Sequence, residues 1–142
     1  MIKYSIIIPS YNEYENLKLL IPELLEVLKD SMHLYEVLII DRMSKDEETF
    51  SLTQSYKIRY IQRVGGDRYG DAVRSGISAA IGRTIIFMDG DGSHNPEEIL
   101  ELSKYSDSYD LVVSSRYLTS STSENTYLKE LGSIFLNKIC SV

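Results

Sequence analysis

The sequence predicts an α/β domain with a doubly wound, mostly parallel sheet and helices on both faces. Short apolar runs of strand length recur along the chain, and each is apolar at consecutive positions, which is typical of parallel strands buried on both faces. Helical patterns lie between these runs, so the connections should be right-handed βαβ crossovers. The 142 residues, with 43% hydrophobic content, are enough for one compact domain with a single core.

The elements follow one another in strict alternation. The predicted strands are Tyr4–Ile8, Tyr35–Ile40, Ile58–Gln62, Thr84–Met88 and Asp110–Ser114. The clearest helical pattern lies between the first two strands, where apolar residues recur at helical spacing: Leu17, Leu20, Ile21, Leu24 and Leu28. Ser10 and Glu13 are spaced as a capping box at its start. Weaker helical patterns cover Lys45–Tyr56, Asp71–Ile81 and Pro96–Lys104, the last with a proline suited to a first turn.

The pattern changes after Arg116. Residues 1–118 form the predicted core, and residues 119–126 read as a Ser/Thr-rich loop. Residues 127–142 carry one more amphipathic helical pattern, made by Leu128, Leu131, Phe135 and Ile139. We interpret its apolar face as packing against the sheet or a further segment, in preference to membrane contact, because its flanks are not basic.

Composition excludes several classes of protein. A formal net charge of -6 without a Lys/Arg cluster disfavours nucleic acid as a partner. The single cysteine, Cys140, cannot form an internal disulfide, which fits a reducing compartment. The apolar runs are far shorter than the ~20 residues that span a bilayer, and no secretory signal pattern opens the chain. We therefore expect a cytoplasmic protein.

Polar residues follow the predicted strands where each one ends. The segment 9–13 follows the first strand, Asp41 the second, the segment 89–91 the fourth and Arg116 the fifth. Since ligands of open α/β sheets bind beyond the carboxyl ends of the strands, these four clusters predict one binding edge.

The sharpest feature is the sequence IIFMDGDGSHNPEE, in which Asp89 and Asp91 leave a buried strand separated by one glycine. In a tight turn both carboxylates can converge on a hard cation such as Mg²⁺ or Mn²⁺, which keeps positions open for substrate phosphates. A solvated Asp-Gly turn is the plain alternative. His94 could ligate a metal, but a histidine beside a proline is more often a turn residue.

Three other features carry weaker signals. Asp41 could accept hydrogen bonds from a nucleobase or ribose, or it could cap a helix. Gly70 would let the backbone approach a ligand, and Gly76 would let a helix pack closely on the sheet. Arg116 could offer a charged fork to a phosphate or lie on the surface. Neither G-x-x-x-x-G-K-[ST] nor G-x-G-x-x-G occurs, which disfavours nucleoside triphosphatases and dinucleotide enzymes.

Taken in order, the motifs IIIPSYNEYENL, VLIIDRMSKDEET, RYGDAVRSGISAAIGRTIIFMDGDGSHNPEEI and VVSSRY resemble family 2 glycosyltransferases of the GT-A fold, and most closely the polyprenol-phosphate (dolichol-phosphate) mannose or glucose synthases. The resemblance covers about Ile2 to Arg116. It implies a metal-dependent enzyme that transfers a hexose from a GDP- or UDP-linked sugar to an acceptor, a polyprenyl phosphate or else a saccharide, with inversion. Residues 1–118 would then form the nucleotide-sugar-binding core.

The resemblance also implies roles for individual residues. The nucleotide would contact Pro9, Ser10, Tyr11, Glu13, Asp41, Arg68, Gly70 and Asp89. Mg²⁺ or Mn²⁺ would be held by Asp89 and Asp91, with Ser93 in the metal shell. Asp89, Asp91 and Arg116 would serve catalysis, Arg116 as a phosphate-contacting arginine.

The sequence departs from the family in two respects. The family motif D-D-G-S is replaced by Asp41-Arg42-Met43-Ser44, which affects the expected base recognition. The family's acceptor-binding elements have no counterpart here, so we expect a fragment or a degenerate short protein. Peripheral contact with the cytoplasmic face of a membrane and homo-oligomerisation stay open. A noncatalytic nucleotide-sugar-binding module is the alternative; a sugar-phosphate nucleotidyltransferase is disfavoured, because IIIPSYNE replaces its basic glycine-rich loop.

Overall fold

The structure is a computed structural model that describes residues 1–31, 34–42 and 46–114. Nearly all of them belong to one compact unit, Met1–Val112; of the second unit, Val113–Val142, only two residues are described. The first unit contains a four-stranded sheet in the order β3-β2-β1-β4, and every neighbouring pair is parallel. Its strands are β1 (Tyr4–Pro9), β2 (Tyr35–Asp41), β3 (Arg59–Gln62) and β4 (Thr84–Phe87).

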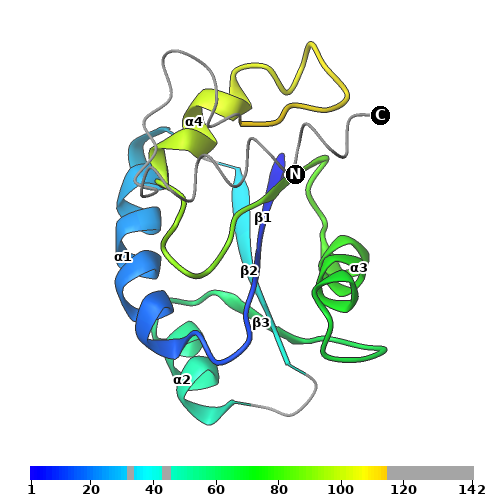
Figure 1. Ribbon diagram of the computed structural model, residues 1–142. Coiled ribbons are helices and arrows are strands. Elements are labelled where there is room, and N and C mark those ends of the chain that lie inside the picture. The colour runs from blue at the N-terminus through cyan, green and yellow to red at the C-terminus, as the bar shows by residue number, and fades with distance from the viewer. Residues whose placement is uncertain (32–33, 43–45, 115–142) are drawn as a thin grey trace, which may run out of the picture. The chain divides into compact units, whose positions relative to one another are not determined.

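Helices cover both faces of this sheet, as Figure 1 shows. The helices are α1 (Tyr14–Ser31), α2 (Glu47–Ser55), α3 (Tyr69–Ala79) and α4 (Glu97–Ser103). In Figure 1, α1 and α2 lie on one side of the strands and α3 on the other. This two-sided cover explains why the strands are apolar at consecutive positions. Among the described residues no helix combines the length and hydropathy that a bilayer span requires.

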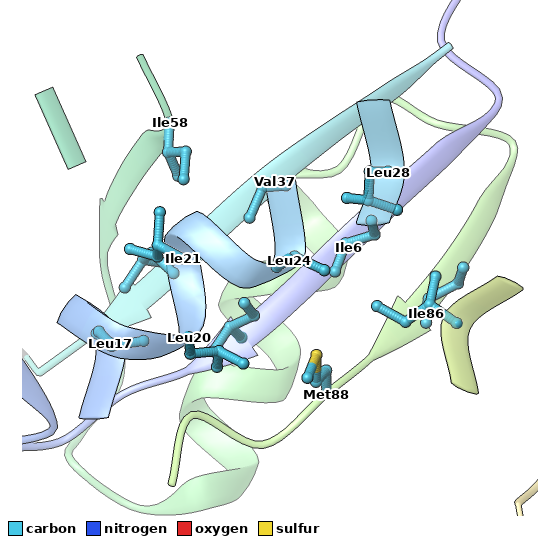
Figure 2. Packing of buried hydrophobic residues seen from close by; sticks show 13 residues of the cluster. Ile6, Leu17, Leu20, Ile21, Leu24, Leu28, Val37, Ile58, Ile86 and Met88 are labelled. Atoms are coloured by element: carbon cyan, nitrogen blue, oxygen red, sulfur yellow. The ribbon is translucent and has the colours of Figure 1, made fainter. Parts of the chain in front are cut away.

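The larger core lies between α1 and the sheet. The helical stripe predicted from the sequence is buried in one cluster with the sheet, and Figure 2 shows Leu24 and Leu28 beside Ile6 of β1, with Leu17 and Ile21 farther along the helix. Each such side chain contributes about 1.5–3 kcal/mol when it is fully buried. This burial sustains the helix across Pro22, which lies inside α1 on its exposed side and cannot donate a backbone hydrogen bond.

The second core, on the face covered by α3, is smaller. It consists of Ile7, Leu38, Ile40 and Ala72. A Cβ atom added to Gly76 of α3 would lie 2.6 Å from Cγ2 of Ile7. The expectation that Gly76 lets this helix approach the sheet is therefore confirmed.

A polar network ties α3 to the amino ends of the strands. The carboxylate of Glu36 accepts hydrogen bonds from Ser5 Oγ (2.5 Å) and from the backbone N–H of Ile81 (2.8 Å), and it forms an ion pair with Arg59. Ser5 Oγ in turn accepts a hydrogen bond from the backbone N–H of Gly82. Burial opposes ionisation of Glu36, but these hydrogen bonds outweigh it and lower its pKa.

Four of the five predicted strands and the four predicted helices within the described residues are confirmed, with ends that differ by at most three residues. The fifth strand, at Asp110–Ser114, was a wrong prediction: the described residues 110–114 are not in a strand, and Leu111 is 80% exposed. Three consecutive apolar residues do not make a strand unless a neighbour pairs with them. The loop and helix predicted for residues 119–142 lie outside the described residues.

The predicted capping box at the start of α1 is also wrong. The helix begins at Tyr14, so Glu13, and not Ser10, stands immediately before its first residue. The carboxylate of Glu13 accepts a hydrogen bond of 2.5 Å from the side chain of Asn16, and Ser10 Oγ makes none with the described residues. The reason is that Asn12 adopts a positive φ of 60°, which turns the chain before the helix starts.

Candidate functional site

Asp41 occupies the carboxyl end of β2 and is fully buried. Its Oδ2 accepts a hydrogen bond of 2.9 Å from the hydroxyl of Tyr60, whereas its Oδ1 is buried without a partner among the described residues. Burial raises the pKa of Asp41, against hydrogen bonds from the backbone of Arg42 and from Tyr60 that lower it. A buried acceptor without a partner costs about 1–3 kcal/mol, which a ligand donor could recover.

Tyr60 holds this carboxylate from the neighbouring strand β3. Its hydroxyl also accepts a hydrogen bond from the backbone N–H of Asp46, and its ring packs edge-on against Phe50 of α2. Burial, together with Asp41, raises the pKa of Tyr60 to about 12, so the phenol stays protonated and remains a donor.

Ser10 lies beside Asp41 across the two central strands. Pro9 of β1 pairs with Ile40 of β2, and the next residue, Ser10, donates its backbone N–H to the carbonyl of Ile40 at 2.9 Å. Ser10 is 1% exposed, and its hydroxyl, like Oδ1 of Asp41, is buried without a partner among the described residues. Two adjacent residues at one sheet edge thus keep hydrogen-bonding capacity that the described chain does not use.

The remaining residues of the β1–α1 loop are more exposed. Tyr11 is 49% exposed, and its ring centroid lies 5.9 Å from Cζ of Arg63. Asn12 Oδ1 accepts a hydrogen bond of 2.8 Å from Arg42, which joins this loop to the end of β2. Pro9 and Glu13 are partly buried. Predicted nucleotide residues from two strands therefore lie side by side.

Arg63 follows β3 and is 5% exposed. Among the described residues, its side chain donates hydrogen bonds to backbone carbonyls in three separate segments: Ser10; Ile40 and Asp41; and Asp67 and Arg68. Its backbone N–H donates to the carbonyl of Asp41 as well. The sequence analysis did not single out Arg63, because an arginine next to an apolar strand gives no sign of where its side chain lies.

The turn after β4 carries Asp89 and Asp91. Gly90 between them is buried against β1: a Cβ atom there would lie 3.2 Å from both Cγ2 of Ile8 and the carbonyl oxygen of Pro9. This close contact places the acidic turn at the same sheet edge as the β1–α1 loop. Both carboxylates are accessible, since the side chain of Asp89 is 44% exposed and Asp91 is an exposed residue.

Ser93 and His94 hold this turn in place. Ser93 donates its backbone N–H to Oδ1 of Asp91 at 2.9 Å, and its hydroxyl also hydrogen-bonds that carboxylate; these bonds lower the pKa of Asp91. His94 Nδ1 accepts a hydrogen bond of 3.3 Å from the backbone N–H of Asp89, and Nε2 lies 3.9 Å from Oδ2 of Asp89. In the described geometry Ser93 supports Asp91, and His94 acts as a turn residue.

These two carboxylates fit a hard divalent cation that is only partly enclosed by protein. They supply oxygen ligands, and the low pKa of Asp91 keeps that group ionised. The described ranges contain no cluster of three or more Asp, Glu, His or Cys side chains that could hold a metal. A cation at Asp89 and Asp91 would therefore need ligand phosphates and water to complete its shell, as Mg²⁺ commonly does.

Helix α3 brings its first turn to this edge. The hydroxyl of Tyr69 donates to Oδ1 of Asp89 at 3.5 Å, and burial, followed by the charge of Asp89, raises the pKa of Tyr69. Arg68 is exposed and immediately precedes the helix, where its backbone N–H is held by Asp71 at 3.1 Å. A Cβ atom at Gly70 would meet only Arg74, at 3.7 Å, so the described chain leaves space beside that backbone.

In the described part of the chain, the candidate residues at the carboxyl ends of β1, β2 and β4 lie at one edge of the sheet. The candidate residues at the start of α3 lie at the same edge. Arg116 lies outside the described residues. Two further residues belong to this edge, Tyr60 and Arg63. Tyr60 was assigned to a strand by its apolar pattern, and only the alternation of side chains along β3 could have indicated that it faces the same side as Asp41.

Comparisons with known proteins identify the family of this chain. The family model described as glycosyl transferase family 2 matches residues 5–140. Dolichol-phosphate mannosyltransferase of Pyrococcus furiosus is 33% identical over 127 residues, which are 87% of this chain and 36% of that protein. Human dolichyl-phosphate beta-glucosyltransferase is 33% identical over 111 residues, 70% of this chain and 34% of that protein. The chain spans about a third of the length of these curated relatives.

Solved structures share the fold at lower identity. Mannosyl-3-phosphoglycerate synthase from Rubrobacter xylanophilus superposes with a TM-score of 0.64 at 17% identity, covering 77% of this chain and 38% of the other. Glucosyl-3-phosphoglycerate synthase from Mycobacterium tuberculosis, solved in complex with Mn²⁺, UDP and phosphoglyceric acid, gives a TM-score of 0.59 at 18% identity, covering 76% of this chain and 40% of the other.

Proposed function

The chain belongs to glycosyl transferase family 2 and has the GT-A fold, and we propose that it is the donor-binding part of an enzyme that transfers a hexose from a nucleotide sugar to an acceptor. The preferred acceptor is a polyprenyl phosphate, since the two relatives named above carry dolichol-phosphate sugar transfer in their names. A saccharide acceptor is the second choice.

One observation carries this proposal: Oδ1 of Asp41 and Oγ of Ser10 are buried and unpaired among the described residues, and the two residues are neighbours across β1 and β2. Together they offer an anionic acceptor and a hydroxyl that can both donate and accept. The edge of a nucleobase or a ribose presents complementary groups. Arg68, Tyr11 and Gly70 lie on the exposed border of this edge and would contact the rest of the nucleotide.

Asp89 and Asp91 would hold Mg²⁺ or Mn²⁺ against the donor diphosphate. A structural neighbour was solved with Mn²⁺ and UDP, which supports a divalent cation in this family of folds. Such a cation would neutralise the negative charge that develops on the departing nucleoside diphosphate. The chain's own part is to hold both carboxylates in place, through Ser93 for the side chain of Asp91 and through the His94 contact for the backbone of Asp89.

The chemistry requires little proton transfer if the acceptor is a phosphate. An acceptor phosphate oxygen would form a bond to the anomeric carbon as the bond from that carbon to the diphosphate oxygen breaks, and the configuration would invert. A phosphate monoester with a second pKa of about 6 is already largely anionic at pH 7, so no general base is needed. Arg116 is proposed to contact a phosphate in this step.

A noncatalytic nucleotide-sugar-binding module is the second candidate. The two candidates differ in turnover. Incubation with a nucleotide sugar, Mn²⁺ and a polyprenyl phosphate would yield a glycosylated lipid and free nucleoside diphosphate in the first case. Donor binding with no lipid product would favour the second.

Calorimetric titration tests the donor site itself. We expect either UDP-glucose or GDP-mannose to bind the parent protein in Mn²⁺, to bind about tenfold or more weakly with chelator, and to bind Asp91→Asn as weakly as the chelated parent. Asp107→Asn is the matched control, since Asp107 is an exposed carboxylate that pairs with Lys3 away from this edge. Binding by neither donor would overturn the proposal; equal binding by Asp91→Asn would overturn its metal part.

A further inference from the structure

Every N–H group of the Arg63 guanidinium lies within hydrogen-bonding distance of a backbone carbonyl at the sheet edge. The group has five N–H donors, one on Nε and two on each Nη, and they meet five carbonyl oxygens. Nε donates to Asp41 at 3.0 Å; Nη1 donates to Asp67 at 3.1 Å and Arg68 at 3.4 Å; Nη2 donates to Ser10 and, at 3.4 Å, to Ile40.

These carbonyls come from three segments that are distant from one another in sequence. Ser10 starts the β1–α1 loop, Ile40 and Asp41 end β2, and Asp67 lies in the β3–α3 loop. Each segment carries residues proposed to bind the nucleotide sugar. A planar, five-donor fork can join three backbone segments at fixed angles, which the flexible ammonium of lysine cannot do.

The charge of Arg63 is buried without a counter-ion in the described ranges. The residue is 5% exposed, and no ion pair joins it to a described carboxylate. Carbonyl dipoles compensate the cation only in part, and an uncompensated buried charge is costly. The ring of Tyr11 lies 5.9 Å away on the outer side and adds a cation–π contact.

We propose that Arg63 is the positioning residue of the donor site: it fixes the three segments in their ligand-binding arrangement through their carbonyls, and its charge favours the anionic diphosphate without contacting it. This inference rests on the proposed function. Because all five donors are already engaged, Arg63 acts through Ser10, Asp41 and the loop before α3, and not as a direct ligand contact.

Binding of nucleoside mono- and diphosphates in Mn²⁺ tests the proposal. Arg63→Lys keeps the charge but loses the planar guanidinium group with its five donors. We therefore expect the diphosphate that the parent binds most tightly to bind this variant at least about tenfold more weakly. Arg63→Met loses both, and we expect a further loss that is larger for the diphosphate than for the monophosphate. Arg59→Lys is the matched control from the other end of β3, where Arg59 pairs with Glu36, and should bind within about twofold of the parent.

Nitrogen-15 NMR of the parent protein provides a second test that does not depend on how the variants fold. The Arg63 N–H signals should exchange slowly with water before nucleotide is added and should stay slow afterwards, with no phosphorus coupling to the guanidinium. Coupling to the diphosphate, or unchanged affinity of folded Arg63→Lys, would overturn this inference alone. Failure of the parent to bind any nucleotide would overturn the proposed function as well.

Discussion

The hydroxyl of Tyr60 donates a 2.9 Å hydrogen bond to one oxygen of Asp41 and leaves the other oxygen, in the described part of the chain, buried and unpaired. A strand-to-strand contact therefore orients the carboxylate that we place at the nucleotide. The arrangement is costly for folding, since burial raises the pKa of Asp41. Sites that bind ligands commonly keep such unfavourable features.

Replacement of Tyr60 by phenylalanine should weaken donor binding about five- to twentyfold, because the second carboxylate oxygen loses its donor and the group is no longer oriented. It should also raise the pKa of Asp41 further, since the Tyr60 bond lowers that pKa. When the pH is lowered, the variant should therefore lose donor binding at a higher pH than the parent protein does. Calorimetry across pH 4–8 measures both effects. Tyr56→Phe, at an exposed tyrosine after α2, is the control.

Replacement of Asp41 by asparagine should separate stability from function. The pKa of Asp41 is raised in the folded state, so its ionisation destabilises the native state. This destabilisation develops as the pH rises through the unfolded-state pKa, and it persists at every pH above the folded-state pKa. Asp41→Asn should therefore be more stable than the parent at pH 7, by about 1 kcal/mol, and this advantage should shrink below pH 4. Donor binding should be lost. Urea unfolding at pH 3 and pH 7 checks the first claim; a less stable Asp41→Asn at pH 7 would contradict it.

Glu36, at the other end of the same strand, should show the opposite pH dependence. Its pKa is lowered, so its stabilising contribution is present above the unfolded pKa and is lost as pH falls through the folded one. Glu36→Gln should lower the free energy of unfolding by about 2 kcal/mol at pH 7 and by little at pH 3. The value at pH 7 already includes a reduction because Arg59 is partly exposed to solvent. Donor affinity of the folded variant should not change. A loss of affinity would show that the amino-end network also shapes the site.

Two glycines of α3 provide a matched pair. Gly76→Ala would bring a Cβ atom to 2.6 Å from Ile7 and should lower stability by about 1–3 kcal/mol. Gly70→Ala meets only Arg74 at 3.7 Å and should raise stability by about 0.5–1 kcal/mol through helix propensity. If a ligand approaches the backbone at Gly70, the same methyl group should weaken donor binding several-fold. Thermal unfolding and calorimetry on both variants test this contrast, and undiminished binding by Gly70→Ala would contradict the role of Gly70.

Local pattern was sufficient for most of the fold. Consecutive apolar residues predicted four parallel strands, and the Leu17–Leu28 stripe predicted α1, because burial on two faces or on one helical face leaves a clear periodicity. The same reasoning failed where burial was absent, as at residues 110–114, and where backbone geometry decided the outcome, as at Ser10 before α1. Neither the lack of a strand at residues 110–114 nor the turn before α1 leaves a periodic pattern of apolar residues in the sequence.

The sequence by itself predicted which residues could carry chemistry here: the acidic turn at Asp89 and Asp91, and Asp41 at the end of a strand. Only the tertiary structure decided their neighbours. The strand order β3-β2-β1-β4 places β3 beside β2, so Tyr60 reaches Asp41 and Arg63 reaches the carbonyls of three separate segments. The physical reason is that periodicity records which side of an element is buried, whereas strand order depends on packing between segments far apart in the chain.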